Sequence, residues 1–311
     1  MQSACIGTLL EIAEKDSGVL YLTADSGEGG LDVLFRMNFP DRSFNFGIAE
    51  NVLVGAAAGM AAAGKTPFVY TAAPFLVYRS YEFLRNDVCL QDLNVKFIGT
   101  GSGLSVSTLG PTHHTTEDIS ALRALPNLMI LSPATPKEAR AAMLAAYGHE
   151  GPVYIRLGAE KAPEFYEGEL DSVENFRAMR EGSDIAIFST GDVLSEAMRA
   201  AELLEGRGIS AKIINVPVLK PFDGAKMLEA AGTCRTIVSL EEHNVMGGLG
   251  SMIAEELASG RSGHRLIRIG LEDRFSVGYG TIENVRGENG VSAECIADKA
   301  AKGFEDERIE I

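Results

Sequence analysis

A glutamate that opens a helix of small residues is the first candidate for chemistry in this sequence. Glu50 ends the block FNFGIAE, and alanine and glycine dominate residues 54–64 after it. A helix with so little side-chain bulk has to pack closely against another element. An acidic residue near a helix N-terminus complements the helix dipole, so its position alone favours a structural role. Catalysis by Glu50 therefore needs support from other residues.

Aromatic residues recur at every third position along a helix that we predict over residues 75–90. Phe75, Tyr78 and Tyr81 form this stripe. Such a stripe is more often part of a core than of a cofactor site. Two of its members are tyrosines, whose hydroxyl groups need hydrogen-bond partners when they are buried, and this favours a pocket wall with a polar edge.

Two adjacent histidines lie in a predicted turn. His113 and His114 end the motif GPTHH, and Thr115 follows as the predicted N-cap of the next helix. Neighbouring side chains in a turn do not easily point into the same site. We therefore expect at most one of the two histidines to be functional.

Other motifs of nucleotide and metal binding are weak or missing. Glycines cluster at residues 27–30, 99–103 and 247–250, but none of these clusters has the dinucleotide-binding spacing, so structural turns explain them better. The four cysteines are far apart, with no CxxC pair and no histidine at metal-ligand spacing. We expect no metal site in this chain and a reducing compartment.

Composition excludes several classes of partner. The chain has 311 residues, and 43 acidic residues against 28 basic ones give a formal charge of −15. Such a charge repels nucleic acids and anionic membrane surfaces. Charged residues interrupt residues 1–20, and no long apolar stretch follows, so we expect neither a signal peptide nor a membrane span. A cytoplasmic location is the expectation.

Short β-rich runs that alternate with helical patterns predict an α/β fold with a largely parallel sheet. The predicted strands of the first half lie at residues 18–23, 67–70, 95–98 and 128–131. The helix predicted at 135–147 has the clearest start. Thr135 is its expected N-cap, Pro136 takes the first helical position, and Glu138 completes a capping box.

A second α/β rhythm follows a stretch in which the periodicity fails. Acidic residues, glycines and Pro163 accumulate over residues 158–183, which is typical of a surface connection. Predicted strands at 185–188, 211–214 and 236–240 then alternate with predicted helices at 192–206 and 248–259. We therefore predict two doubly wound, mostly parallel-sheet domains, at residues 1–170 and 183–311, joined by a linker at 171–182.

Taken together and in this order, these blocks resemble the transketolase family. The matching motifs are FNFGIAEN with its small-residue helix, the aromatic run before RNDV, GPTHH, LPNLMILSPATPKEA, EEHNVMGGLGS and RIGLEDRF. They extend over nearly the whole chain. The resemblance implies that residues 1–170 are a thiamine-diphosphate pyrimidine-binding domain and that residues 183–311 are a transketolase C-terminal domain.

The resemblance also implies a two-subunit enzyme. In this family a further domain binds the cofactor diphosphate through Mg²⁺ with a GDG-type motif, and no such motif followed by a metal-ligand asparagine occurs in this sequence. The expected partner is a separate diphosphate-binding subunit that holds the metal, in an α2β2 heterotetramer. The implied reaction is transfer of a two-carbon ketol unit between sugars or sugar-like substrates.

The family pattern gives several residues a role toward the cofactor. The glutamate that matches Glu50 donates a hydrogen bond to the aminopyrimidine ring and favours the imino tautomer that deprotonates the thiazolium carbon. The residues that match Phe75, Tyr78 and Tyr81 pack on the pyrimidine ring. Asp25 matches an acid near the cofactor, and an ordinary strand-end aspartate is an equally good interpretation.

The substrate side departs from the family pattern at two positions. His113 matches a histidine that contacts the sugar-derived substrate and shuttles a proton. Leu109 stands where transketolases usually have an aspartate that accepts a substrate hydroxyl, and Ala159 stands where an arginine grips the substrate phosphate. Arg79, Arg156 or arginines of the partner subunit are candidate replacements for that arginine, and a structural role is the better interpretation of Arg156. These departures argue against an ordinary pentose-phosphate substrate in the usual pose.

Three other interpretations stay open at this point. The chain has features of the β subunit of a 2-oxo acid dehydrogenase decarboxylating component, of a deoxyxylulose-phosphate synthase relative, and of a regulatory subunit with a decayed cofactor site. GPTHH together with NFGIAEN favours transketolase over the first two. Retention of Glu50 and of the three aromatic residues argues against the third.

Overall fold

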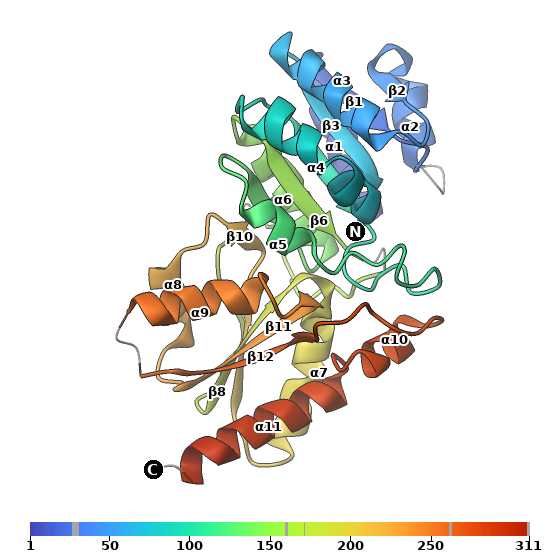
Figure 1. Cartoon of the computed structure of the whole chain (residues 1–311). Coiled ribbons are helices and arrows are strands. Elements are labelled where there is room, and N and C mark those ends of the chain that lie inside the picture. Colours follow the sequence, from blue (N-terminus) through green and yellow to red (C-terminus); the bar gives the residue numbers. More distant parts are fainter. Residues whose placement is uncertain (27–30, 159–160, 171, 261–262, 310–311) are drawn as a thin grey trace. The chain divides into compact units, whose positions relative to one another are not determined.

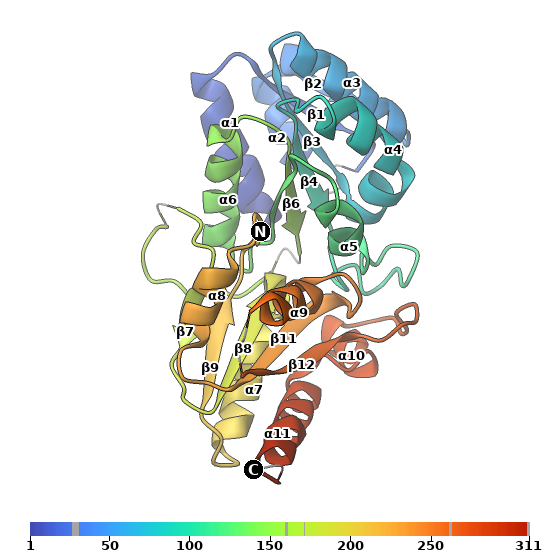
Figure 2. The ribbon, with the colours of Figure 1, turned by 60° about the vertical axis from the view of Figure 1, so that its left-hand side comes forward.

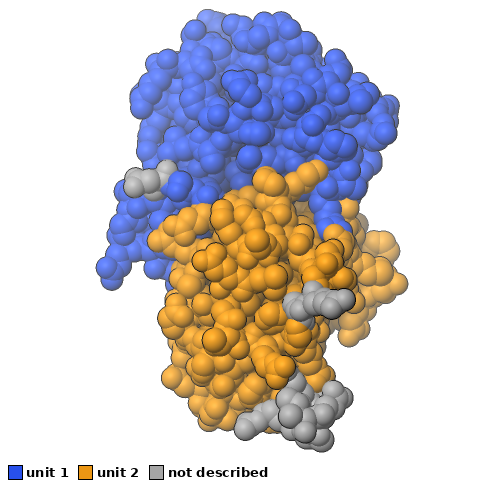
Figure 3. Space-filling view, turned by 90° about the vertical axis from the view of Figure 1, so that its left-hand side faces the viewer, with its two compact units in different colours: residues 1–102, 121–173 blue, residues 103–120, 174–311 orange. Residues whose placement is uncertain are grey.

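The chain divides into two compact units (Figure 3). A computed structural model describes residues 1–26, 31–158, 161–170, 172–260 and 263–309. The first unit comprises Met1–Ser102 and Ala121–Val173, and the second comprises Gly103–Ser120 and Glu174–Ile311. The segment Gly103–Ser120 thus belongs to the second unit, although it interrupts the sequence of the first. A division of the chain into consecutive domains does not anticipate this.

The first unit is a parallel sheet with helices on both faces. Its elements are α1 (Gln2–Lys15), β1 (Val19–Thr23), α2 (Leu31–Asn38), η1 (Pro40–Arg42), β2 (Ser43–Asn45), α3 (Glu50–Ala62), β3 (Thr66–Ala72), η2 (Phe75–Arg79), α4 (Tyr81–Phe83), η3 (Leu84–Cys89), β4 (Lys96–Thr100), the second half of α5 (Asp118–Arg123), β5 (Met129–Leu131), α6 (Pro136–Gly148) and β6 (Val153–Leu157). Its strands follow the order β5-β6-β4-β3-β1-β2. Figure 2 shows α1 and α6 side by side on one face and α3 with α4 on the other.

Local sequence explains these elements. All five residues of β1 and of β6 are buried, as expected for strands of a parallel sheet that is covered on both faces. The predicted helix 135–147 is confirmed as α6. The Thr135 side chain caps it by accepting a hydrogen bond from the Glu138 backbone N–H at 3.2 Å, and Pro136 occupies the first helical position.

The helix predicted over residues 75–90 is helical but is not a continuous α-helix. The elements η2 and η3 are π-helical and flank the short α4. A π-helix closes i→i+5 hydrogen bonds, and such wide turns are frequent at functional sites. Because the turn is wider than in an α-helix, residues three positions apart do not share a face in the way that the sequence periodicity suggests.

The second unit is built on a smaller sheet, of which Figure 1 labels β8, β11 and β12. Its strand order is β12-β11-β8-β9-β7. Its elements are β7 (Arg177–Arg180), β8 (Ile185–Thr190), η4 (Gly191–Val193), α7 (Leu194–Glu205), β9 (Ala211–Asn215), β10 (Val218–Lys220), α8 (Gly224–Ala231), β11 (Thr236–Asn244), α9 (Leu249–Ser259), β12 (Arg265–Leu271), α10 (Ile282–Glu288) and α11 (Ala293–Ile309). The pairs among β12, β11, β8 and β9 are parallel, whereas the edge strand β7 is antiparallel to β9. Helices α7 and α11 pack against each other.

The predicted fold class, α/β with two mostly parallel sheets, is confirmed. One detail differs from the sequence prediction, because β7 lies inside the range 171–182 that we expected to be a linker. The domain limits at 1–170 and 183–311 stay a prediction. No helix within the described ranges is long and apolar enough to cross a membrane.

Candidate functional site

Glu50 is a buried carboxylate at the first position of α3. Its side chain is 1% exposed, and the residue follows the carboxyl end of β2 by a short connection. Ligands of open α/β sheets bind outside the carboxyl ends of the strands, so this is the edge where chemistry is expected. A buried charge needs a partner. That partner is Arg79, whose Nη1 forms an ion pair with Glu50 Oε2.

Arg79 reaches Glu50 from η2 and keeps a path to solvent. Its side chain is 42% exposed, and its guanidinium carbon lies 5.0 Å from the centroid of the Phe75 ring. Sequence analysis identified Glu50 and Phe75 as site residues but missed that Arg79 links them. The guanidinium therefore covers both the carboxylate and the aromatic ring.

The small-residue helix packs closely, as its composition predicts. Helix α3 contacts η2, α4 and η3. A Cβ atom placed on Gly55 would lie 3.7 Å from the Phe83 ring, which is ordinary van der Waals distance. The alanines and glycines of α3 thus let the segment that carries the aromatic residues approach the helix that carries Glu50.

The three predicted aromatic residues have different environments. Phe75 and Tyr81 are half-buried, whereas Tyr78 is exposed. The Tyr81 hydroxyl donates a hydrogen bond to the Ala121 carbonyl at 3.0 Å, which satisfies its polar end. The π-helical turns explain why the stripe does not form one uniform wall.

Polar side chains join the carboxyl ends of β1, β2 and β3. Asn45 accepts a hydrogen bond from the Asp25 backbone N–H at 3.1 Å and donates one to the Asp25 carboxylate at 3.2 Å. Ser26 and Thr71 share a hydrogen bond of 2.7 Å between their hydroxyl oxygens. Asp25 is exposed and has a positive φ of 55°. Sequence analysis named Asp25 and missed Asn45, whose place at the end of an adjacent strand was the available signal.

The two adjacent histidines of GPTHH lie in the second unit and differ in burial. Both backbone N–H groups donate to the Gly110 carbonyl, at 2.9 Å for His113 and 3.1 Å for His114. His113 is half-buried, and its Nδ1 lies 3.0 Å from the Thr112 hydroxyl oxygen. His114 is buried, and its Nδ1 lies 2.7 Å from the Ser276 hydroxyl oxygen. Burial lowers the pKa of His114.

The residues tied to substrate recognition have contrasting positions. Leu109 is exposed at the loop that carries His113. Arg156 is a buried residue of β6, where it pairs with Gly99 of β4. Ala159 lies outside the described residues. Glu50, Phe75, Tyr78, Tyr81, Asp25 and Arg156 thus belong to the first unit, and His113 belongs to the second.

Consecutive residues at the end of β11 hold the segment Gly103–Ser120. Glu242 Oε2 accepts a hydrogen bond from the Leu104 N–H at 3.1 Å, and His243 Nε2 accepts one from the Ser120 N–H at 3.2 Å. The Asn244 N–H donates to the Thr116 carbonyl at 2.7 Å. A register shift of β11 against β12 between Leu240 and Asn244 breaks the regular ladder at this point.

Glu241, the residue before Glu242, binds the start of α9 instead of the segment Gly103–Ser120. Its carboxylate accepts hydrogen bonds from the backbone N–H groups of Leu249 at 2.7 Å and Gly250 at 2.9 Å, at the start of α9. This satisfies N–H groups that have no partner inside the helix. The motif EEHNVMGGLGS, which sequence analysis used only as a family marker, therefore holds two segments through adjacent side chains.

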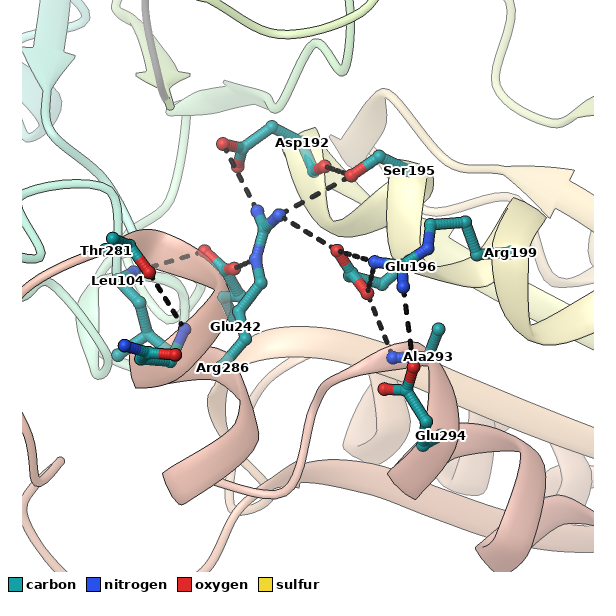
Figure 4. A network of polar contacts seen from close by, with 11 residues as sticks. Leu104, Asp192, Ser195, Glu196, Arg199, Glu242, Thr281, Arg286, Ala293 and Glu294 are labelled. Carbon is teal, nitrogen blue, oxygen red and sulfur yellow. Dashed lines mark hydrogen bonds and ion pairs between the residues drawn. The ribbon is translucent and has the colours of Figure 1, made fainter.

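Glu242 belongs to a buried ionic network centred on Arg286 of α10 (Figure 4). Arg286 Nε donates to Glu242 Oε1 at 2.5 Å, and its other nitrogens lie 3.5 Å from carboxylate oxygens of Asp192 and Glu196. Glu196 also accepts the Ala293 N–H at 2.9 Å. Arg286 is 6% exposed and its three acidic neighbours are buried as well.

The pKa shifts of Glu242 and Arg286 follow from their burial and from their mutual contact. Burial raises the pKa of Glu242, against the opposing effect of the Arg286 guanidinium. Burial alone lowers the pKa of Arg286, but Glu242, Asp192 and Glu196 together raise it above its ordinary value. The acidic neighbours of Arg286 thus favour its charged form. Among the residues that the structure describes, no group of three or more acidic, histidine or cysteine side chains is arranged to hold a metal ion.

Comparison with known proteins assigns both halves of the chain. The family profile "Transketolase, pyrimidine binding domain" matches residues 1–163, and "Transketolase, C-terminal domain" matches residues 175–293. Together these matches account for most of the sequence.

Relatives of similar length are components of transketolases. A component of the apulose-4-phosphate transketolase of Actinobacillus succinogenes is 37% identical over 280 residues, which cover 90% of this chain and 90% of that protein. The SqwH component of the 6-deoxy-6-sulfo-D-fructose transketolase of Clostridium sp. strain MSTE9 is 36% identical over 277 residues, with coverages of 88% and 85%. A solved split-gene transketolase, an inactive beta4 tetramer, matches with a TM-score of 0.88 at 34% identity over 97% of both chains. The chain therefore belongs to the transketolase family of transferases, and it corresponds to the subunit of a split transketolase that joins the pyrimidine-binding and C-terminal domains.

Proposed function

We propose that this chain forms the pyrimidine side of a thiamine-diphosphate site and that Glu50 is its activating carboxylate. The observation that carries the proposal is the burial of Glu50 at a sheet edge beside aromatic residues. Its ion-pair partner is the half-exposed Arg79, which a ligand can displace without leaving a buried cation. The residues present thus fit an aromatic, nitrogen-containing ring that takes a proton from a carboxyl group.

Thiamine diphosphate, when bound, would supply the nucleophilic carbon for two-carbon transfer. Glu50 holds a proton at the pyrimidine ring nitrogen, and the half-buried rings of Phe75 and Tyr81 supply stacking area. Asp25 lies at the same sheet edge. In the second unit, His113 moves a proton at a substrate hydroxyl. These assignments follow the family pattern residue by residue.

The proposed substrate is a sugar or sugar-like ketose that is recognised without an acid at position 109. Leu109 presents an apolar side chain where a hydroxyl acceptor is expected, and Ala159 replaces the expected arginine. Two relatives support this interpretation, because they are named for apulose 4-phosphate and for a sulfonated fructose, which are not ordinary pentose phosphates. Arg156 is buried in β6, so Arg79 is the better placed candidate for an anionic group.

The proposal includes a second subunit that carries the GDG motif, binds Mg²⁺ and the cofactor diphosphate, and completes an α2β2 assembly. The naming of relatives as separate subunits supports it. So does the solved relative, which is inactive as a tetramer of beta subunits alone. Four free cysteines support a cytoplasmic enzyme.

Reconstitution tests this function. The chain is mixed with a GDG-bearing transketolase subunit, thiamine diphosphate and Mg²⁺, and transfer from a ketose to an aldose is measured. Glu50→Gln should lower kcat by about two to four orders of magnitude, because it removes the proton donor. The exposed Glu82→Gln, in the neighbouring segment, serves as the matched control.

Two outcomes contradict the proposal. Turnover by the chain without a partner removes the need for a second subunit, and near-normal turnover by Glu50→Gln removes Glu50 from the mechanism. Release of carbon dioxide from pyruvate, with no transfer from a ketose, supports the 2-oxo acid decarboxylating class instead.

A further inference from the structure

We propose that Glu242 is a positioning residue for His113 and that Arg286 holds Glu242 in place for this purpose. The inference rests on the proposed function, because it assigns the C-terminal half of the chain a part in the same reaction. It is carried by the way in which one buried network binds the loop that presents His113.

The loop that carries His113 is closed at its base by pairing of Gly103 with Thr115, and we call these two residues the neck. The Gly103 N–H donates to the Thr115 carbonyl at 3.0 Å, and the Thr115 N–H donates to the Gly103 carbonyl at 2.9 Å. Residues 104–114, with Leu109 and His113 among them, form the loop between these two bonds. The conformation of His113 relative to the second unit therefore depends on what holds this neck.

Glu242 binds at the neck through its carboxylate. Its Oε2 accepts the Leu104 N–H, the first amide inside the loop. A Cβ atom on residue 103 would lie 2.5 Å from that same oxygen, and Gly103 has a φ of +63°. Only glycine meets both conditions without strain. The close contact between the backbone at residue 103 and the carboxylate therefore requires both Gly103 and Glu242.

Arg286 connects the neck to the residues just before α10, which also contact the loop. It binds Glu242 from α10, and the stretch of chain just before α10 contacts the loop directly. Ser107 and Gly280 exchange two hydrogen bonds, of 2.7 and 3.1 Å, and the Tyr279 ring lies against Gly110 so closely that a Cβ there would be 2.2 Å from it. Arg286 therefore has two effects. It fixes the Glu242 carboxylate, which binds the neck, and it fixes α10, whose preceding residues contact the loop.

A purely structural role for this network predicts a different result from a positioning role. If the network only stabilises the second unit, weakening it loosens the whole unit. If it positions the loop, weakening it at Glu242 loosens the neck first.

Hydrogen exchange of the full-length chain separates these cases. In Glu242→Gln, we expect the amides of Leu104 and Thr115 to exchange about tenfold faster or more, while the amides of β8 keep their wild-type rates. Gly103→Ala, which disturbs the same contact from the other side, should give the same local pattern. Glu294→Gln is the control, because Glu294 lies at the exposed rim of the network, 3.4 Å from Arg199. Unchanged neck amides, or equal acceleration in β8, overturn the proposal.

Kinetics of the reconstituted enzyme give a second and independent readout. Glu242→Gln should raise KM for the ketose and lower kcat while the dissociation constant of thiamine diphosphate stays the same. In a His113→Ala background the same substitution should have little further effect, because both changes act through one side chain. Full additivity of the two effects contradicts the inference. Wild-type turnover by His113→Ala would instead refute the proposed role of His113, and the exchange experiment still decides whether Glu242 holds the loop.

Discussion

The two units each contain a glutamate–arginine pair, and the pairs are built in opposite ways. In the first unit the carboxylate of Glu50 is buried but Arg79 is half-exposed and faces a single acid. In the second, Arg286 is as buried as the three acids around it. A guanidinium enclosed by carboxylates is a fixed part of the fold, whereas one that reaches solvent is available for exchange with a ligand. The Glu50–Arg79 pair therefore suits a binding site, whereas the network around Arg286 suits a structural role that holds other segments in place.

The energetic reason lies in desolvation. Removing one member of a buried ion pair leaves an uncompensated charge away from water, which is far more costly than the loss of an exposed pair. Arg286 is almost completely shielded from water, with 6% of its surface exposed. Arg79 can leave Glu50 and become hydrated.

The largest expected effect comes from removing the buried cation. Arg286→Met should lower the free energy of unfolding by about 3–5 kcal/mol, because the buried acids Asp192 and Glu242 would lose the guanidinium that neutralises them and Glu196 would keep only the exposed Arg199. Urea denaturation followed by circular dichroism measures this. Glu294→Gln at the exposed rim of the same network should leave it nearly unchanged. Similar values for the two variants would contradict the view that burial separates the two pairs.

Lys96 sharpens the comparison, because it is a buried cation whose partners are neutral. Its Nζ donates to the carbonyls of His149 at 2.5 Å and Gly151 at 2.7 Å. Burial lowers the pKa of Lys96 to about 8, whereas the acids around Arg286 raise the pKa of that residue. The unfolded chain, with an ordinary lysine pKa, therefore binds more protons than the folded one between about pH 8 and 10.5.

It follows that the stability contributed at Lys96 rises with pH in this window. The cost of burying the charge is complete below about pH 8 and disappears above the unfolded pKa, a change of about 3 kcal/mol. The measurement is urea denaturation from pH 8 to 10 for the wild type and for Lys96→Met, since the difference between them isolates this group. An equal pH dependence in both proteins would show that Lys96 does not lose its proton in the fold.

The smallest expected effect, and the most informative about function, comes from Arg79→Met. Without ligand the variant should lose about 1 kcal/mol of stability, because Arg79 is the half-exposed member of the pair and water can take its place beside the Glu50 carboxylate. With the partner subunit present, thiamine diphosphate should bind several-fold more tightly, since no guanidinium competes for the carboxylate. Thermal shift with and without cofactor records both changes. Arg85→Met, an exposed arginine of the next turn, is the control, and weaker cofactor binding in Arg79→Met would show that Arg79 assists the ligand.

Sequence reasoning recovered the features that depend on local order. The α/β rhythm, the Thr135 cap and the position of Glu50 at the start of a small-residue helix follow from neighbouring residues, and all three are seen in the structure. What it missed depends on long-range pairing or on helix type. The Glu242–Arg286 pair joins residues 44 positions apart, and nothing in the sequence distinguishes a π-helix from an α-helix at 75–90.

The neck formed by Gly103 and Thr115 also has a consequence for how new specificities arise. The loop is closed by backbone hydrogen bonds and is anchored from outside by β11 and, at Ser107 and Gly110, by the residues just before α10. Between these two anchors lies a short exposed stretch, Thr108 and Leu109, which can differ between relatives while every anchoring contact stays the same. Grafting that stretch from a transketolase of known substrate is a direct route to changing which sugar this enzyme accepts.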